Sequence, residues 1–173
     1  FPDRKQGVLF YGLPTETGDG LLMGKAIGAG TINLQCTTTY PNGIEVAPGR
    51  SIDTTGSSTF ALKKNAIFVD KSGKRVVNEN SSLALLAQKT LQAPGKILYL
   101  VMDRDGYAAY VKKAIDDHTF ANADVFEGWK KLVNNGRPAH CEGELEACAK
   151  TMGIDPKGLV DQGAQWNADV KAG

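Results

Sequence analysis

The sequence has 173 residues and a formal net charge of +1, with 42% hydrophobic and 23% charged residues. A chain of this length can bury one sizeable core, or one core plus part of a second domain, and the composition is ordinary for a globular protein. No block of basic or acidic residues points to nucleic acid or to a membrane surface, and the longest apolar runs are far too short to span a bilayer. The sequence opens in mid-pattern at Phe1, without a start methionine, which predicts a piece of a larger protein.

The first forty residues predict a strand, a helix and a second strand. VLFYG has the apolar character of a short strand. Asp19 and Gly20 can open a helix with an apolar side, and Gly28 and Gly30 can end it. TINLQCTTTY is rich in β-branched residues and predicts a strand that runs into Pro41.

The middle of the chain predicts a loop, a hairpin and a helix. Residues 41–60 are rich in Gly, Pro, Ser and Thr, which predicts a long irregular loop of the kind that often carries function. AIFVD and RVVN flank the turn KSGK and predict a β-hairpin. SSLALLAQKTLQ then predicts a helix with Ser81 or Ser82 as its N-cap.

The remaining residues predict one buried strand, ILYLVMD, followed by helices. These helices are expected at GYAAYVKKAIDD, EGELEACAKTMG and DPKGLVDQGAQWNADVKAG, and VFEGWKKLVNNG is expected to be a short helix or a helix plus a strand. Asp155 is the expected N-cap of the last one, with Pro156 at its first position. Strands and helices are mixed without a regular βα alternation, so the sequence predicts an α+β fold with a small mixed sheet and packed helices.

The cysteines and histidines do not form a recognisable ligand pattern. Three cysteines, Cys36, Cys141 and Cys148, do not make a disulfide framework or a zinc motif. Cys141 and Cys148 are seven residues apart within one expected helix, where they would share a face as small buried residues. His118 and His140 lack acidic or cysteine partners at metal spacing, so both are expected to be surface or capping residues.

Three polar stretches are candidate sites. In GDG, Gly18, Asp19 and Gly20 could hold a phosphate or hydroxyl at a helix start, although a plain helix N-cap explains them as well. In the predicted loop, Tyr40, Arg50 and Asp53 could bind and protonate a small polar or anionic substrate, although such loop residues are usually only solvated.

The third polar stretch is NENSS, which follows the predicted hairpin. Asn78 and Glu79 could tie loops together through hydrogen bonds from side chain to backbone, or could be exposed turn residues. From the residues alone, the chain is an α+β domain with a conspicuous polar loop.

A set of stretches in fixed order resembles a known family. TGDGLLMGKAIGAG, LQCTTTYP, GKRVVNEN, ILYLVMD and GELEACAKTMGIDPKGLVDQGAQWNADVKAG together resemble the flavoprotein subunits of fumarate reductase and succinate dehydrogenase, in the soluble branch that includes urocanate reductase. In this family a Rossmann-like FAD domain is interrupted by a capping domain that closes over the substrate. The resemblance implies that residues 1–40 are an edge segment of the FAD-binding domain and that residues 41–173 are the capping domain.

The resemblance also implies what surrounds this chain. The GxGxxG strand–turn–helix and the family's substrate-binding histidine segment are not in the sequence, so we expect this piece neither to retain FAD nor to turn over alone. Its expected partners are a small-molecule substrate and the FAD-binding domain of the same parent chain. Nucleic acid and membrane segments are not expected. An exposed face left by the missing domain would allow self-association.

Site residues carry over from the family one at a time. The family pattern QxxxxHP corresponds to residues 35–41, with Tyr40 in place of the histidine that binds a substrate carboxylate. A phenol is uncharged at neutral pH, so it recognises a polar group by hydrogen bonding more than a carboxylate by charge. The family's TEAVRG proton relay has no clean match, although Asp53 falls near the relay carboxylate and Arg50 is close by. Gly18, Asp19 and Gly20 are the implied FAD contacts.

The family's proton-donating arginine is missing from its expected place. Four residues after the glutamate of NE stands Leu83, which can neither donate a proton nor stabilise a developing carbanion. The implied parent is therefore an FAD-dependent oxidoreductase that reduces or dehydrogenates an activated C–C bond, with a substrate other than ordinary fumarate. The alternatives are a non-catalytic binding or regulatory module, and a cap that serves only as a lid.

Overall fold

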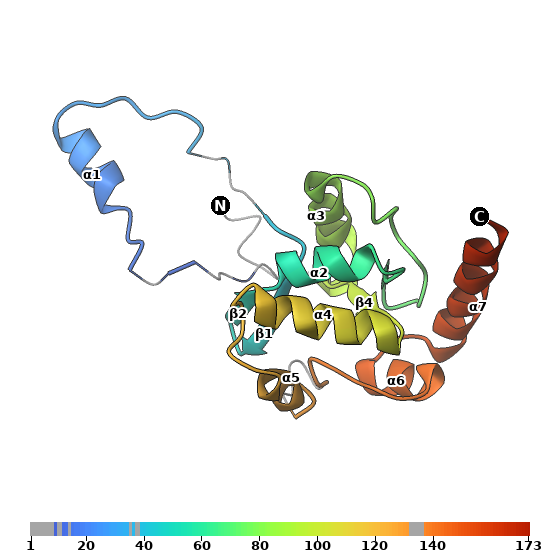
Figure 1. The fold of residues 1–173 in the computed structure, drawn as a ribbon. Helices are drawn as coiled ribbons and strands as arrows, with labels where there is room; N and C mark the ends of the chain where they lie inside the picture. The colour runs from blue at the N-terminus through green and yellow to red at the C-terminus, as the bar shows by residue number, and fades with distance from the viewer. Residues whose placement is uncertain (1–8, 10–11, 14, 35, 37–38, 132–136) are drawn as a thin grey trace.

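The computed structural model describes residues 9, 12–13, 15–34, 36, 39–131 and 137–173 (Figure 1). The helices of this part are α1 (Asp19–Ala26), α2 (Thr55–Leu62), α3 (Leu83–Gln92), α4 (Arg104–Asp116), α5 (Asp124–Trp129), α6 (Leu145–Met152) and α7 (Pro156–Ala172). The strands are β1 (Gly43–Ala47), β2 (Arg50–Asp53), β3 (Ile67–Val69) and β4 (Tyr99–Val101). The α+β class is confirmed, and the described strands form two separate two-stranded antiparallel sheets, β1–β2 and β3–β4.

The predicted loop over residues 41–60 is wrong, because these residues form a hairpin and a helix. β1 and β2 pair antiparallel, with Gly43 opposite Asp53 and Ala47 opposite Arg50. Pro48 and Gly49 make the turn between them, and Gly49 has φ of 75°, a value that glycine adopts at little cost. Ile44, Val46 and Ile52 pack against a buried core, so the apolar alternation on both sides of Pro–Gly was the signal for the hairpin.

The hairpin predicted around KSGK forms only in part. Its turn is present, since the Gly73 amide donates to the Asp70 carbonyl at 3.0 Å. The returning residues make an isolated bridge between Arg75 and Val69, and the partner strand of β3 is β4. A strand selects its partner through side-chain packing, which a local sequence pattern does not specify.

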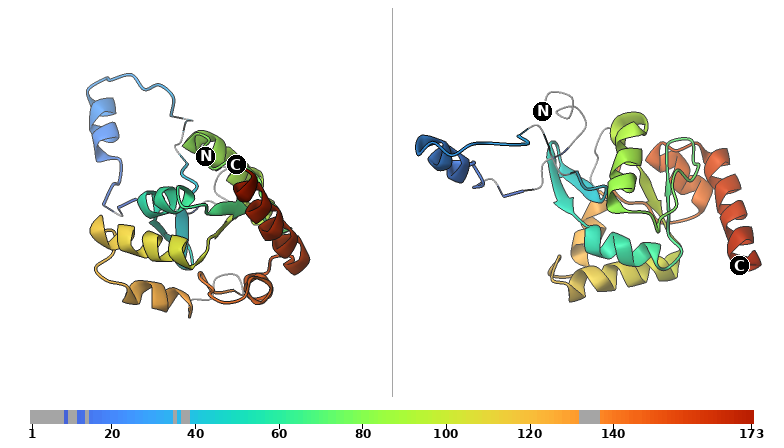
Figure 2. Two further views of the ribbon diagram at one scale, coloured as in Figure 1. Left: turned by 45° about the vertical axis from the view of Figure 1, so that its right-hand side comes forward. Right: turned by 90° about the horizontal axis from the view of Figure 1, so that it is seen from above.

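Two buried clusters make up the interior. The first joins α2, α4 and α5, with Tyr110, Phe120, Phe126 and Trp129 in edge-to-face aromatic contacts. The second joins the β3–β4 sheet to α6 and α7 through buried aliphatic residues and Tyr99. The left view of Figure 2 shows α4 and α5 on one side of β4 with α6 and α7 beyond it.

The segment that carries α1 extends away from both clusters (Figures 1 and 2). The predicted helix is confirmed, but none of its residues is buried, and Leu22 and Met23 are 63% and 64% exposed. The strand predicted over residues 31–40 does not form among its described residues. Instead the Cys36 amide donates to the carbonyl of Asn33, which has φ of 56°, and Ile32 is 84% exposed. The strand predicted at VLFYG falls mostly outside the described residues.

The C-terminal helices follow their sequence signals closely. Asp155 caps α7, its carboxylate accepting from the amides of Lys157 and Gly158, and Pro156 is the first helical residue. Ser82 caps α3 by accepting from the Leu85 amide at 3.3 Å. No helix in the described part of the chain has the length and apolar character needed to cross a bilayer.

Candidate functional site

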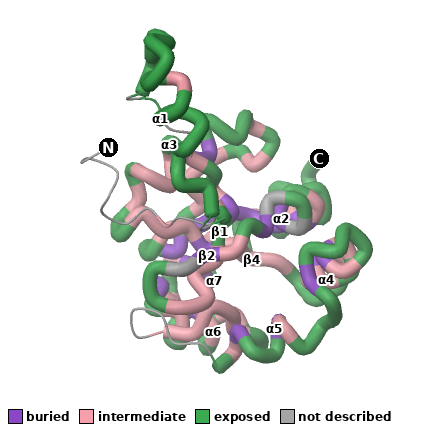
Figure 3. Tube along the Cα trace, turned by 90° about the vertical axis from the view of Figure 1, so that its left-hand side faces the viewer, coloured by how far each residue is buried: buried purple, intermediate pink, exposed green. Residues whose placement is uncertain are grey.

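A cleft of about 1290 Å³ opens in the body of the protein. Its lining includes Tyr40 and Asn42, which precede β1, all three residues of β4, and residues 137–142. The cleft therefore collects residues from segments that are far apart in sequence. The tube in Figure 3 shows that these wall segments are largely of intermediate burial.

The structure separates the three residues predicted in the substrate loop. Tyr40 is 45% exposed and lies just before β1, whose first residue, Gly43, is paired with Asp53. Arg50 is at the opposite end of β2, about 10 Å from Asp53 at the usual rise of a strand. The side chain of Arg50 lies outside what the structure describes. Tyr40 and Asp53 thus share one end of the β1–β2 hairpin, and Arg50 marks the other end.

Asn42 is a buried polar residue beside Tyr40 that sequence reasoning missed. Its backbone carbonyl accepts from the amide and the hydroxyl of Thr54, which anchors the start of β1 to the start of α2. Asn42 is 5% exposed, and neither Oδ1 nor Nδ2 of its amide has a hydrogen-bond partner in the described structure. Burying such a group without a partner is costly, so the Asn42 amide is a natural anchor for a polar molecule in the cleft.

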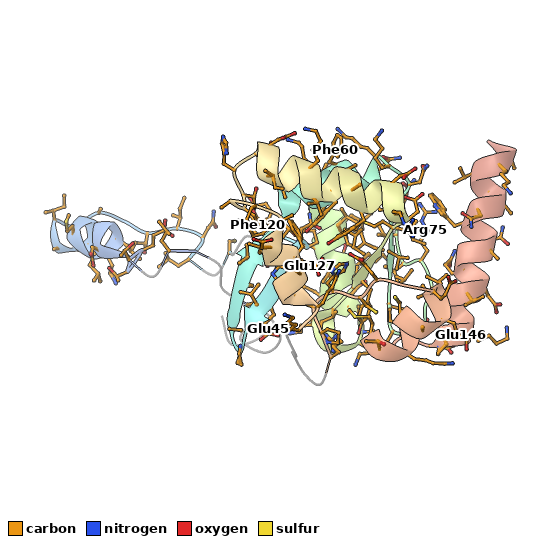
Figure 4. All side chains as sticks on the ribbon, turned by 60° about the horizontal axis from the view of Figure 1, so that its bottom comes forward. Glu45, Phe60, Arg75, Phe120, Glu127 and Glu146 are labelled. Carbon is orange, nitrogen blue, oxygen red and sulfur yellow. The ribbon has the colours of Figure 1, made fainter. Side chains whose placement is uncertain are left out.

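A second polar group in the cleft forms around Glu142. Its carboxylate lies 3.3 Å from Lys130 Nζ and 3.6 Å from His140 Nε2, and Lys130 also pairs with Glu127 at 2.7 Å. The His140 ring stacks on Tyr107 of α4 with centroids 4.8 Å apart. These contacts fasten residues 140–142 onto α4 and the end of α5. Figure 4 shows Glu127 on α5.

Burial and nearby charges shift the pKa values of Tyr107 and His140, which lie beside Glu142. Burial, reinforced by the Glu142 carboxylate, raises the pKa of Tyr107 to about 12, so its phenol stays protonated. Burial also lowers the pKa of His140, against the opposing pull of Glu142. His140 Nδ1 is buried without a hydrogen bond of good geometry, although the Phe126 carbonyl lies beside the ring.

The histidine predictions are confirmed for one residue and wrong for the other. His118 is exposed and follows the end of α4, as expected. His140 is half-buried inside the Glu142 group, although no metal-ligand spacing marks it in the sequence. The one local signal was the acidic residue two positions after it. Among the residues described here, no three His, Cys, Asp or Glu side chains gather as metal ligands would.

Glu79 of the NENSS stretch acts as a brace. Its side chain is 6% exposed, and Oε1 accepts from the Phe68 amide of β3 at 3.0 Å. Arg75 donates to the same carboxylate through Nε and Nη2, while its own amide donates to Gln162 of α7 and its guanidinium covers the Trp166 ring. Figure 4 shows Arg75 beside α7. NENSS therefore links β3, the turn and α7, and Leu83 begins α3 at 40% exposure.

The GDG stretch lies on the extended N-terminal segment and not in the cleft. Gly18 has φ of 83° and is the N-cap of α1, and Asp19 is the first helical residue. No atom comes within 4 Å of a Cβ built on Gly18 or Gly20, so a ligand could approach the backbone closely there. Because the N-cap residue is a glycine, no N-cap side chain hydrogen-bonds to the amides at the start of this helix.

Known proteins match the chain at the levels of sequence and fold. Urocanate reductase of Eggerthella lenta is 28% identical over 180 residues, which cover 99% of this chain and 26% of that protein. The solution NMR structure of a fumarate reductase flavoprotein subunit from Lactobacillus plantarum matches with a TM-score of 0.55 and 25% identity, over 69% of this chain and 71% of the solved one. No protein-family profile matches the chain.

These matches make the chain similar in sequence and fold to the fumarate-reductase-like flavoproteins. The resemblance to this family seen in the ordered sequence stretches is confirmed. It spans about a quarter of the length of the curated relative that it matches.

Proposed function

We propose that this chain is the substrate-capping part of a larger FAD-dependent oxidoreductase, with residues 1–40 as the edge of its FAD-binding domain. The observation that carries the proposal is the alignment of nearly the whole chain with 26% of a urocanate reductase. The parent enzyme reduces or dehydrogenates an activated C–C bond of a small organic substrate. Such a cap acts by closing over bound substrate and excluding water.

The residues proposed to contact FAD are Gly18, Asp19 and Gly20. Open space around both glycines fits close approach of a ligand, and the amides at the start of α1 suit an oxygen-bearing group. These three residues make only an edge of a binding site, and the rest of it would come from the parent chain. When bound, FAD supplies hydride chemistry at its ring.

The proposed substrate contact is Tyr40. Its exposure at the rim of the cleft and its place beside the unpaired Asn42 amide favour recognition of a polar substrate group. Leu83 gives α3 an apolar start where the family places an arginine, so a substrate other than ordinary fumarate is proposed. Tyr40 is the proposed proton donor, with Arg50 and Asp53 as secondary candidates.

The test of Tyr40 is Tyr40→Phe in the full-length flavoprotein, which removes the hydroxyl and keeps the ring. Loss of a general acid should slow the chemical step by about two orders of magnitude. Tyr110→Phe is the matched control, because Tyr110 is 4% exposed and its phenol lies near Thr54 and Ser58 within the core. An unchanged single-turnover rate in Tyr40→Phe would remove Tyr40 from the proton-donating role.

The substrate class is tested separately by following reoxidation of the reduced flavin. Enoates and enones with a polar substituent should reoxidise it, and fumarate should be a poor substrate. If none of these compounds reoxidises the flavin, the non-catalytic binding or regulatory module becomes the better explanation. This result would leave the similarity to the flavoprotein reductases untouched.

The proposed partner of α1 is the remainder of the FAD-binding domain in the same parent chain. Leu21, Leu22, Met23 and Ile27 of this segment are exposed, and contiguous apolar surface of this kind usually packs against protein. In the isolated chain the same surface is proposed to support self-association. Its dependence on protein concentration can be measured by sedimentation.

A further inference from the structure

Cys141 and Cys148 come together although they do not share a helix. The expectation that both lie on one helical face is wrong, because α6 begins at Leu145 and Cys141 belongs to the preceding loop. The two side chains nevertheless lie close enough for Cys141 to contribute to the raised pKa of Cys148, and both residues are half-buried on the wall of the cleft.

The start of α6 explains why the two side chains lie close together. Cys148 is in the first turn, with its amide donating to the Glu144 carbonyl at 2.9 Å. Helical side chains lean toward the N-terminus, so the Cys148 thiol projects over the loop that precedes the helix. Gly143 passes beneath it, and a Cβ built on Gly143 would lie 3.9 Å from Cys148 Sγ. Gly143 has φ of 141°, a conformation that turns the loop back toward the helix.

We propose that Cys141 and Cys148 form a reversible disulfide, which makes the start of α6 a site of redox modification. The oxidant is a peroxide. Cys141 attacks one peroxide oxygen and becomes a sulfenic acid as water leaves, and the Cys148 sulfur then displaces a second water to form the S–S bond. Two thiols and one peroxide give one disulfide and two waters, and a dithiol reductant reverses the change.

The surroundings of Cys148 set the order of these steps. Burial, together with Cys141 and the carboxylates of Glu142 and Glu144, raises the pKa of Cys148 to about 12. Cys148 therefore remains a thiol at neutral pH and is a poor first nucleophile. The first attack falls to Cys141, and Cys148 resolves the sulfenic acid.

The disulfide would act on the polar group in the cleft. Cys141 directly precedes Glu142, whose carboxylate contacts Lys130 and His140. A disulfide at Cys141 would therefore tie this loop to α6. The loop could then no longer leave α4 and α5 without moving the helix. Oxidation should raise Tm by several degrees, because the bond restricts the unfolded chain.

The experiment uses a Cys36→Ser variant, which removes the exposed third cysteine and leaves the pair. Stoichiometric peroxide should remove both free thiols together and lower the intact mass by two hydrogen atoms. Glu142, Glu144 and Glu146 lie between the two cysteines, so a glutamate-specific protease separates them into different peptides. These peptides should stay linked until a dithiol reductant is added.

Cys148→Ser in the same background is the matched control, and it should add oxygen at Cys141 instead of losing hydrogen. Peptide mapping of the unsubstituted chain gives an independent reading, with two of its three thiols lost as one linked pair. Oxygen added at Cys141 while Cys148 can still be alkylated would overturn the proposal. Dimers linked between chains, without any internal link, would overturn it as well.

Discussion

Glu79 concentrates several contacts on one nearly buried carboxylate. It accepts from the Phe68 amide and from the Arg75 side chain, which in turn covers Trp166. Removing the carboxylate leaves an amide and part of a guanidinium without their partners. The cost of such a loss exceeds the net contribution of the original pair.

We expect Glu79→Ala to lower the free energy of unfolding by about 2–3 kcal/mol. Glu146→Ala is the matched control, because Glu146 pairs with Lys150 on the exposed face of α6 and should cost little that can be measured. Urea unfolding of the two variants makes the comparison. Equal losses in both would show that Glu79 is not a brace.

At the scale of elements, the turn of residues 70–74 docks directly against the start of α7. A Cβ built on Gly73 would lie 2.2 Å from the Leu159 amide nitrogen, and one built on Gly158 would lie 2.0 Å from the Ser72 carbonyl oxygen. The Asp155 amide also donates to the Lys71 carbonyl at 2.8 Å. Backbone packs on backbone here, and any side chain would separate the two segments.

Gly73→Ala should therefore lower the free energy of unfolding by about 3 kcal/mol or more, from positive-φ strain and overpacking together. Gly49→Ala is the control, because Gly49 has the same φ of 75° but no atom near its Cβ position. It should cost only the strain, about 1–2 kcal/mol. The two losses are compared by urea unfolding, and similar values would contradict the close contact with α7.

Elements with local signals were predictable from the sequence, and those that depend on distant partners were not. Ser82, Asp155 and Pro156 marked helix starts that the structure reproduces, since caps act within a few residues. Among its described residues the expected strand before Pro41 did not form, because a strand needs a neighbouring strand that these described residues do not have. The contacts of Asn42 and His140 in the cleft also depend on residues far along the chain.

At the scale of the whole molecule, the two buried clusters are joined partly through the Glu142 group. Lys130 belongs to the α5 side of the cleft, and Glu142 leads into α6, so their ion pair spans the two halves. The groups facing His140 are Tyr107, Lys130, Glu127 and Glu142. Protonation of His140 would put a cation near Lys130 in a half-buried place.

This arrangement predicts that the protein loses stability in mild acid. Burial lowers the folded-state pKa of His140 below its ordinary value of 6.5, so the unfolded chain binds more protons in that range. The contribution of His140 to the free energy of unfolding is complete above pH 6.5. This contribution falls as the pH drops from 6.5 to the folded-state pKa. His140→Gln should flatten the dependence of unfolding free energy on pH between about pH 7 and 5. The same flattening in His118→Gln would contradict the assignment to His140.

The contact between the turn and α7 also has a consequence for related proteins. Gly73 and Gly158 each occupy the space where the other segment's backbone runs, so they act as one unit across 85 positions of sequence. Relatives in which α7 docks in this way should carry glycine at both positions. Relatives that lack glycine at one position should have lost it at the other as well. The two glycines therefore mark a docked C-terminal helix, and the mark can be looked for in an amino-acid sequence alone.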